Sequence, residues 1–153
     1  MERRVTLTLP NGTSIDTDMV ELAMEDSDLS TVYFLNVQTG EVARFSDFDD
    51  EREQQLEEIE SDRNWIAVER ISSHEAYQWM EDFLAEVVTP KNELIAEKLS
   101  IALMGKGAFR RFKDVLYSAG DTWVQAWYQW KDDHLHEAMR RWFEELPLTI
   151  TEE

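Results

Sequence analysis

Residues 31–45 decide the fold class, and they read TVYFLNVQTGEVARF. Residues 31–37 and 41–45 are rich in β-branched and aromatic residues, which are typical of strands. Residues 38–40 separate these two runs and end in glycine. A three-residue loop of this kind is typical of a type I turn followed by a bulge, with Gly40 in the left-handed conformation. The stretch therefore predicts an antiparallel β-hairpin.

Sequence on both sides of the hairpin adds to the sheet. Residues 3–9 alternate in polarity and predict a short strand, which Pro10 and Gly12 end. Residues 64–70 return to strand character, and we expect them to join the hairpin. Between them, residues 47–62 hold nine acidic residues and one arginine. This run predicts a mostly exposed helix or an acidic loop.

The periodicity changes to that of helices from residue 72 onward. Ser72 and Glu75 form a capping box, and Pro90 is expected at the first position of the next helix. Gly105 and Gly120 are expected to end the second and third helices of this part. A fourth helix follows and reaches residue 146. The chain is therefore predicted to be α+β, with a small antiparallel sheet of about three strands and a C-terminal cluster of about four helices. A short helix capped by Asp16 or Thr17 is expected before the hairpin.

We expect a single domain over residues 1–153. It comprises a sheet-containing half at 1–71, a helical half at 72–147 and a tail at 148–153. The length and the 42% of hydrophobic residues suffice for a core. The sequence contains no cysteine, which excludes disulfides and thiolate chemistry. We find no signal-peptide pattern and no apolar run long enough to span a membrane, so we expect a soluble, cytoplasmic protein.

The charge is strongly acidic, with 33 acidic against 15 basic residues and a net charge of -18. Proteins that bind nucleic acid need a basic face, so direct nucleic-acid binding and membrane binding are not expected. Such a charge suits a basic partner, including a protein that normally holds DNA. The alternative is an acidic surface that only keeps the protein in solution, and this is the commoner role of such a charge.

Residues 98–113 are the cationic exception in this acidic chain. They contain five basic residues and no acidic one. Two glycines flank a lysine at the point where one predicted helix ends and the next begins near Ala108. The N-terminus of a helix favours an anion, because its N–H groups have no partner within the helix. We interpret residues 105–113 as an anion- or phosphate-binding turn. Its candidate ligand-binding residues are Gly105, Lys106, Gly107, Arg110, Arg111 and Lys113.

A structural interpretation of the same motif stays open. Lys106 is followed by glycine and alanine rather than by serine or threonine, and it follows a helix instead of a strand. The motif is therefore not a phosphate-binding P-loop. Glycine is commonest at helix ends as a cap. The alternative is a tight turn between two helices, whose bases pair with nearby acids.

Aromatic residues in the helices are interpreted as core. Phe109, Phe112 and Leu116 recur at spacings of three and four, which places them on the same face of the predicted helix. We expect this face to be buried. Helical spacing also relates three tryptophans, Trp123, Trp127 and Trp142. Tyr128 and Trp130 are the expected exceptions, because not all of these rings can share one face.

No residue pattern predicts catalysis. His134 and His136 are two residues apart and point to different faces of a helix, so they cannot chelate a metal together. No motif marks a serine nucleophile, and no acid–base pair stands out among the many carboxylates. We therefore predict no catalytic residue, no metal site and no cofactor, and favour a protein that is not an enzyme.

The chain resembles a known family at residues spread over most of its length. The matching segments are residues 33–36, 39–42, 77–83, 102–116, 127–128 and 142–145. On these residues the chain is similar to the bacterial group called uncharacterised protein family 0158, over roughly residues 18–147. Asn36 stands where the family tends to have aspartate, and Trp130 where phenylalanine is expected. The resemblance implies a fold and a bacterial origin, and it brings no activity, cofactor or catalytic residue.

Three functions are compatible with these observations. The favoured one is a soluble, non-enzymatic binding or regulatory protein that holds an anionic small molecule, most plausibly phosphate-bearing, or an acidic protein segment at residues 105–113. A second is an acidic decoy that binds a basic, nucleic-acid-binding partner through residues 47–62. A third is an enzyme that acts on a phosphorylated substrate, with Lys106 and the arginines as electrophilic stabilisers.

Overall fold

The computed structural model describes residues 6–47 and 49–152. The chain folds as two compact units. The first, the hairpin unit, comprises Met1–Arg70 together with Leu135–Glu153, and the second, the helical unit, comprises Ile71–His134. Helices and antiparallel strands occur together, with α3 to α6 consecutive in the C-terminal part, which confirms the predicted α+β class.

The hairpin unit contains a three-stranded antiparallel sheet in the order β3-β2-β4. Its strands are β2 (Thr31–Asn36), β3 (Val42–Ser46) and β4 (Trp65–Ala67). Val32 lies opposite Phe45 in the β2–β3 pair, and Leu35 lies opposite Ile66 in the β2–β4 pair. The predicted hairpin and its third strand are thus confirmed.

Gly40 ends the hairpin loop in the left-handed conformation, with φ of 75°. The Gly40 backbone also packs against the chain segment that contains Ser14 and Asp16. A Cβ at this position would lie 2.2 Å from the Ser14 carbonyl oxygen. The Gly40 carbonyl accepts a hydrogen bond of 2.9 Å from the Asp16 amide. Gly40 is therefore required twice, by its torsion angle and by the chain that lies against it.

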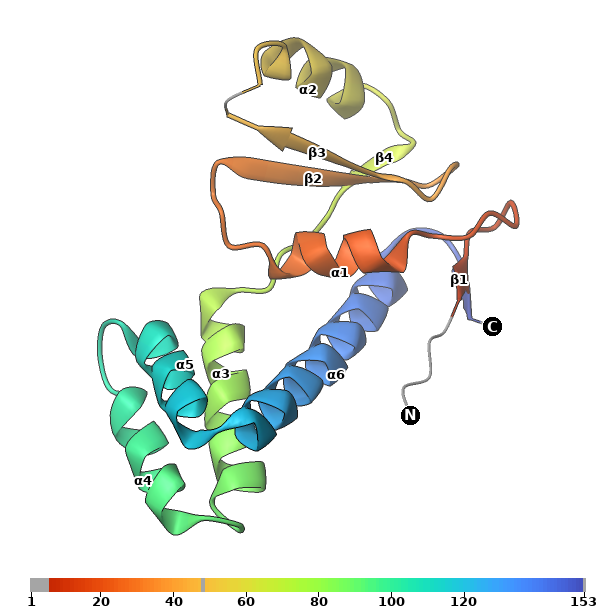
Figure 1. Cartoon of the computed structure of the whole chain (residues 1–153). Helices are drawn as coiled ribbons and strands as arrows, with labels where there is room; N and C mark the ends of the chain where they lie inside the picture. Colours follow the sequence, from red (N-terminus) through yellow and green to blue (C-terminus); the bar gives the residue numbers. More distant parts are fainter. Residues whose placement is uncertain (1–5, 48, 153) are drawn as a thin grey trace. The chain divides into compact units, whose positions relative to one another are not determined.

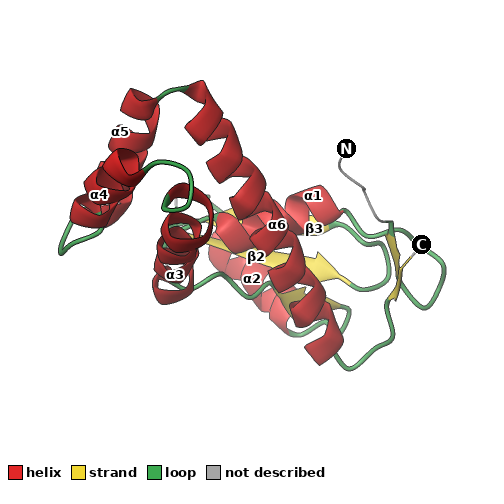
Figure 2. Cartoon of the chain, turned by 90° about the horizontal axis from the view of Figure 1, so that it is seen from below, coloured by secondary structure: helices red, strands yellow, loops and turns green. Residues whose placement is uncertain are grey.

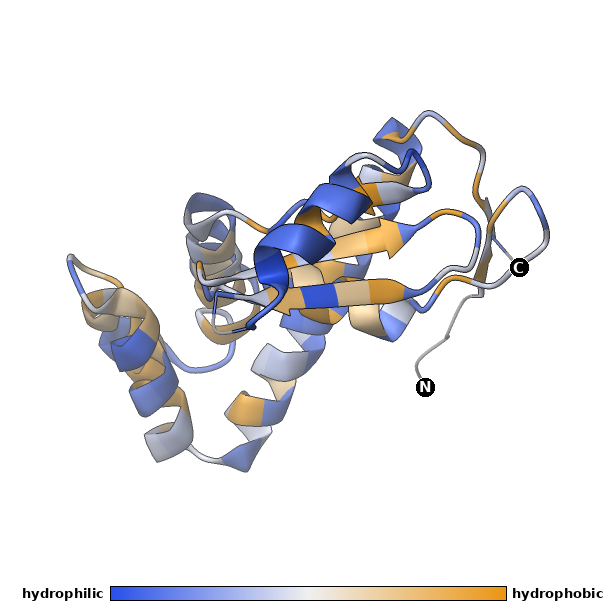
Figure 3. Cartoon of the chain, turned by 90° about the horizontal axis from the view of Figure 1, so that it is seen from above, coloured by the Kyte–Doolittle hydropathy of each residue, from blue (hydrophilic) through white to orange (hydrophobic). Residues whose placement is uncertain are grey.

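Two helices cover opposite faces of this sheet (Figure 1). Helix α1 (Thr17–Glu25) is capped by Asp16, whose carboxylate accepts from the Met19 amide at 3.2 Å, as predicted. Helix α2 (Arg52–Glu60) lies inside the acidic run and buries none of its residues. It is mostly hydrophilic along its length and lies nearest the viewer in Figure 3. The acidic run is therefore an exposed helix, one of the two predicted alternatives.

The ends of the described chain meet in a second, two-stranded sheet. Strand β1 (Leu7–Thr8) pairs antiparallel with β5 (Thr151–Glu152), so that Leu7 lies opposite Glu152. The predicted first strand is found at Leu7–Thr8, and its residues 3–5 lie outside the described part. The sequence pattern did not indicate β5. That the chain forms a single domain stays a prediction.

The helical unit is built from consecutive helices (Figure 2). They are α3 (Ser73–Phe83), a single π-helical turn η1 (Leu84–Val88), α4 (Glu93–Ala102), α5 (Ala108–Ala119) and α6 (Asp121–Glu145), of which residues 121–134 belong to this unit. The Ser72 side chain accepts from the Glu75 amide at 3.1 Å, as the capping box predicts. Phe83, Phe112 and Trp127 are buried in this unit, and their rings make T-shaped contacts with one another.

The start of α4 differs from the prediction. Pro90 is not its first residue, because the helix begins at Glu93 and is capped by Asn92, whose side chain accepts from the Ile95 amide at 3.1 Å. The preceding residues close the π-turn instead, where the Thr89 amide and hydroxyl both donate to the Leu84 carbonyl. An amide-capping side chain at the right position outweighs a favourable proline.

The predicted apolar face of α5 is partly wrong. Phe112 and Leu116 are buried, but Phe109 is 43% exposed, and Ala108 takes its place on the buried face. Residues 108, 112 and 116 are four apart, which keeps them on one side of the helix. Within the described residues, no helix is long and apolar enough to cross a membrane.

Candidate functional site

The candidate site is the turn that joins α4 to α5, which we call the α4–α5 turn (residues 103–107). Gly105 and Gly107 both take left-handed backbone conformations, with φ of 72° and 81°. Gly107 is the N-cap of α5, and it offers no side-chain acceptor to the N–H groups of the first helical turn. The predicted start of α5 at Ala108 is confirmed, and the turn therefore presents unpaired amides.

Arg111 fixes the shape of this turn from α5. Its Nε donates to the Ala102 carbonyl at 3.1 Å, and its two terminal nitrogens donate to the carbonyls of Met104 and Lys106. Carbonyl groups at the end of a helix have no partner inside the helix. A guanidinium has five donors in one plane, so this single side chain satisfies the Ala102 carbonyl at the helix end and two carbonyls of the turn.

The two glycines of the turn differ in their surroundings. A Cβ at Gly107 would lie 2.9 Å from the Arg111 Nη1 atom, so the guanidinium occupies the space beside this glycine. A Cβ at Gly105 would meet no heavy atom within 4 Å. The surface at Gly105 is open, and a ligand approaching there meets backbone without steric hindrance.

The other three cations of the motif are exposed. Lys106, Arg110 and Lys113 form no ion pair with any of the residues that the structure describes. The alternative in which the bases pair with nearby acids does not apply to these side chains within residues 6–47 and 49–152. Arg111 alone is engaged, and its partners are backbone carbonyls. The structure thus separates one structural arginine from three free cations.

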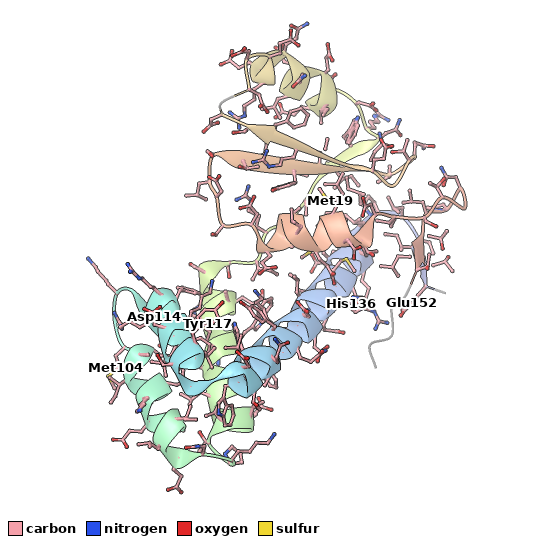
Figure 4. The ribbon with its side chains drawn as sticks, in the orientation of Figure 1. Met19, Met104, Asp114, Tyr117, His136 and Glu152 are labelled. Carbon is pink, nitrogen blue, oxygen red and sulfur yellow. The ribbon has the colours of Figure 1, made fainter. Side chains whose placement is uncertain are left out.

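Exposed aromatic side chains continue this cationic surface along α5. Phe109, Lys113 and Tyr117 are spaced by four and lie along one side of the helix. The hydroxyl of Tyr117 shares a hydrogen bond of 2.7 Å with that of Tyr128 on α6, and this bond raises the pKa of Tyr117. The Lys131 ammonium lies 5.3 Å from the centre of the Tyr128 ring. Figure 4 labels Tyr117 and Asp114 on α5.

Sequence reasoning missed the aromatic part of this surface. It assigned Phe109 to the core, and it gave no role to Tyr117. The fourfold spacing of Phe109, Lys113 and Tyr117 was the available signal, because three large residues on a helix face that lacks Phe112 and Leu116 point away from the core. Tyr128, by contrast, was an expected exception to the core, and it is exposed.

The tryptophans and histidines serve mainly structural roles. Trp127 and Trp142 are buried, as predicted, and the Trp130 indole donates to the Trp79 carbonyl at 3.0 Å. His134 Nδ1 lies 2.8 Å from the Trp130 carbonyl, whereas His136 Nδ1 lies 3.1 Å from Glu21 Oε1. The described residues contain no group of three or more side chains that could hold a metal ion.

Comparison with known proteins identifies the family. A family model described as an uncharacterised protein family, UPF0158, matches residues 14–152. The chain belongs to UPF0158. The match covers the hairpin, the helical unit and the α4–α5 turn, so the candidate site lies within the region that defines UPF0158. Neither the curated proteins nor the solved structures contain a match to this UPF0158 chain.

Proposed function

We propose that this UPF0158 protein is a non-enzymatic binding protein whose α4–α5 turn holds a phosphate-bearing anion. One observation carries the proposal: three exposed cations without an acidic partner in the described chain lie just before α5 or within its first two turns. They do so in a chain whose net charge is -18. Unpaired helix amides and nearby cations both favour a negative ligand.

The side chains of the proposed site have two different roles, ligand contact and positioning of the turn. Lys106, Arg110 and Lys113 contact the ligand, and Arg110 can grip a phosphate through two parallel hydrogen bonds. Arg111 is a positioning residue, because its donors are used by the carbonyls of the turn. Gly105 leaves the backbone accessible. Mutation of Arg111 would therefore change the shape of the site, while mutation of Arg110 would remove a contact.

A thermal-shift experiment tests this proposal. The wild-type protein is titrated with ATP, pyrophosphate and inorganic polyphosphate at low salt, since exposed charges are screened at high salt. A ligand that binds only the folded state, at about one hundred times its Kd, stabilises it by about 2.7 kcal/mol. We expect at least one of these anions to raise the melting temperature of the wild type.

Two double variants with the same change in charge locate the binding. Arg110→Gln/Lys113→Gln removes two cations at the site, and Arg63→Gln/Lys91→Gln removes two exposed cations elsewhere. We expect the first variant to lose the shift, with binding weakened about tenfold or more, and the second to keep it. An equal loss in both variants, or no shift of the wild type with any anion, would refute the proposal.

A further inference from the structure

A second feature of the helical unit is a groove between α3–η1 and α4, with a volume of about 700 Å³. We call it the α3–α4 groove. Its apolar lining includes Leu84, Ala85 and Ala96, and its acidic lining is Glu81, Glu93 and Glu97. No residue of the α4–α5 turn except Leu103 and Met104 reaches it. None of the six candidate residues of the anion site lines the groove, although the two surfaces meet at Leu103 and Met104.

The charge of this groove has one sign. No lysine, arginine or histidine lines it. The three glutamates form no ion pair with the residues that the structure describes, and all three are exposed. Like charges along a cleft focus their field and attract the opposite charge. The groove therefore favours a cationic occupant.

Apolar side chains are exposed next to these carboxylates. Met104 lines the groove and is 68% exposed, and Figure 4 places it at the end of α4. Leu94 and Ile101 of α4 are 64% and 60% exposed. Neither Leu94 nor Ile101 lines the groove, so Met104 supplies the exposed large apolar side chain in the groove itself. An exposed apolar side chain at the edge of a groove adds apolar surface for a partner.

The walls of the groove are held in place by hydrogen bonds. The Tyr77 hydroxyl on α3 donates to the Leu103 carbonyl at the end of α4, at 2.7 Å. At the other end, the Thr89 hydroxyl donates to the Leu84 carbonyl and closes the π-turn, also at 2.7 Å. Isolated π-turns occur often at functional sites. The first of these bonds joins the two walls, and the second holds the π-turn of one wall in shape, which lowers the cost of ordering on binding.

We propose that the α3–α4 groove binds an amphipathic helix of a partner protein, in which lysine or arginine side chains flank an apolar stripe. The apolar side chains of such a helix would cover Leu84, Ala96 and Met104, while its cations would face the three glutamates. Helices commonly bind grooves between two helices in this way. The proposal stands on charge complementarity and exposed apolar surface, and it is independent of the anion site.

A fluorescence-anisotropy titration tests it. The probe is a labelled peptide of about four helical turns with leucine and lysine placed so that they segregate on a helix. We expect it to bind the wild-type protein. A peptide with the same composition in scrambled order should bind at least about fivefold more weakly, because it cannot present an apolar stripe. Equal binding of both peptides would contradict a groove that reads amphipathicity.

Two triple variants with the same change in charge separate the groove from bulk attraction. Glu81→Gln/Glu93→Gln/Glu97→Gln neutralises the groove, and Glu53→Gln/Glu57→Gln/Glu58→Gln neutralises the exposed helix α2. We expect about tenfold weaker peptide binding in the first and less than twofold in the second. Equal losses would assign the binding to the overall charge, and a larger loss in the α2 variant would assign it to residues 47–62, as the acidic-decoy hypothesis expects; either result would overturn the proposal.

The apolar half of the groove has its own test. Met104→Ser removes an exposed apolar side chain at little cost to folding, and we expect peptide binding about threefold weaker. Sedimentation of the free protein examines a second copy of the chain as occupant. If the wild type is a dimer that Met104→Asp converts to a monomer, the groove is a self-association surface and the proposal fails. Absence of any peptide binding to the wild type would refute it as well.

Discussion

Two glycine turns of this molecule share a backbone conformation and differ in everything around it. Gly40 in the hairpin unit and Gly105 in the helical unit have φ of 75° and 72°. A Cβ at Gly40 would lie 2.2 Å from a backbone oxygen, whereas a Cβ at Gly105 would meet nothing within 4 Å. The first turn is filled by the chain itself. The second is open, and three free cations follow it at residues 106, 110 and 113.

This difference shows that a left-handed glycine turn has two different roles in this molecule. At Gly40 the missing side chain admits another segment of the same chain, so glycine is required for folding. At Gly105 the missing side chain leaves backbone accessible from solvent, and folding requires only the torsion angle. Substitutions at the two positions therefore separate a structural turn from a surface that is available to a ligand.

The largest expected effect is that of Gly40→Ala. The left-handed torsion costs about 1–2 kcal/mol with a side chain, and overpacking against Ser14 adds about 1–3 kcal/mol. We expect a loss of about 3 kcal/mol in the free energy of unfolding, measured by urea denaturation. Gly105→Ala should cost only about 1 kcal/mol, because its surroundings are empty. Equal losses of unfolding free energy at the two positions would contradict the difference between the two turns.

The next effect concerns the arginine that holds the open turn. Arg111→Ala removes donors from three carbonyls, and we expect a loss of about 2 kcal/mol. Arg110→Ala, one residue away, should change stability by less than about 0.5 kcal/mol because its side chain is exposed and unpaired among the described residues. Urea denaturation followed by tryptophan fluorescence measures both. Arg111→Lys should restore little, because an ammonium lacks the planar fork of donors.

The smallest expected change in stability concerns Tyr33 in the hairpin unit. The Tyr33 hydroxyl donates to the Asp26 carboxylate at 2.6 Å and lowers the pKa of that carboxyl from its ordinary value. A lowered pKa contributes stability that is present above the unfolded value of about 3.9 and is lost as pH falls through the folded value. Tyr33→Phe should therefore cost about 1 kcal/mol at neutral pH, and the difference should shrink below about pH 4.

Urea midpoints of wild type and Tyr33→Phe, measured from about pH 7 to about pH 2.5, decide this point. A difference that stays constant over the whole range would show that the hydroxyl acts through packing, without coupling to Asp26. The Asp28 carboxylate faces the same loop and has a lowered pKa through its hydrogen bonds to Ser30. Asp28→Asn is therefore a useful companion variant, because it removes a nearby charge and leaves Tyr33 in place.

Local signals predicted the parts of the fold that depend on neighbouring residues. The hairpin followed from β-forming residues on both sides of Gly40, and the caps at Asp16 and Ser72 followed from side chains three residues before the amides they accept from. Where two local signals competed, at Pro90 and Asn92, the prediction was wrong. The sequence contains both, and in the structure the Asn92 side chain caps α4 while Pro90 follows the π-turn.

Tertiary contacts explain what the sequence could not predict. The candidate site residues were named from charge and glycine spacing, but the assignment of Arg111 to three carbonyls depends on the path of the turn. The exposure of Phe109 depends on which face of α5 meets its neighbours. The α3–α4 groove joins residues from two helices and a π-turn that no periodicity indicates. The binding role of the motif itself stays a prediction.

The pairing of β1 with β5 has a consequence for how the protein is made. The Thr8 hydroxyl donates a hydrogen bond to the Thr151 carbonyl, and the two residues are 143 positions apart in the sequence. Strand β1 therefore leaves the ribosome long before its partner strand is synthesised. The helical unit, in contrast, is one continuous segment, Ile71–His134. Domains generally fold from the N-terminus during synthesis. The helical unit can therefore be synthesised in full before residues 151 and 152, the partners of β1, are made.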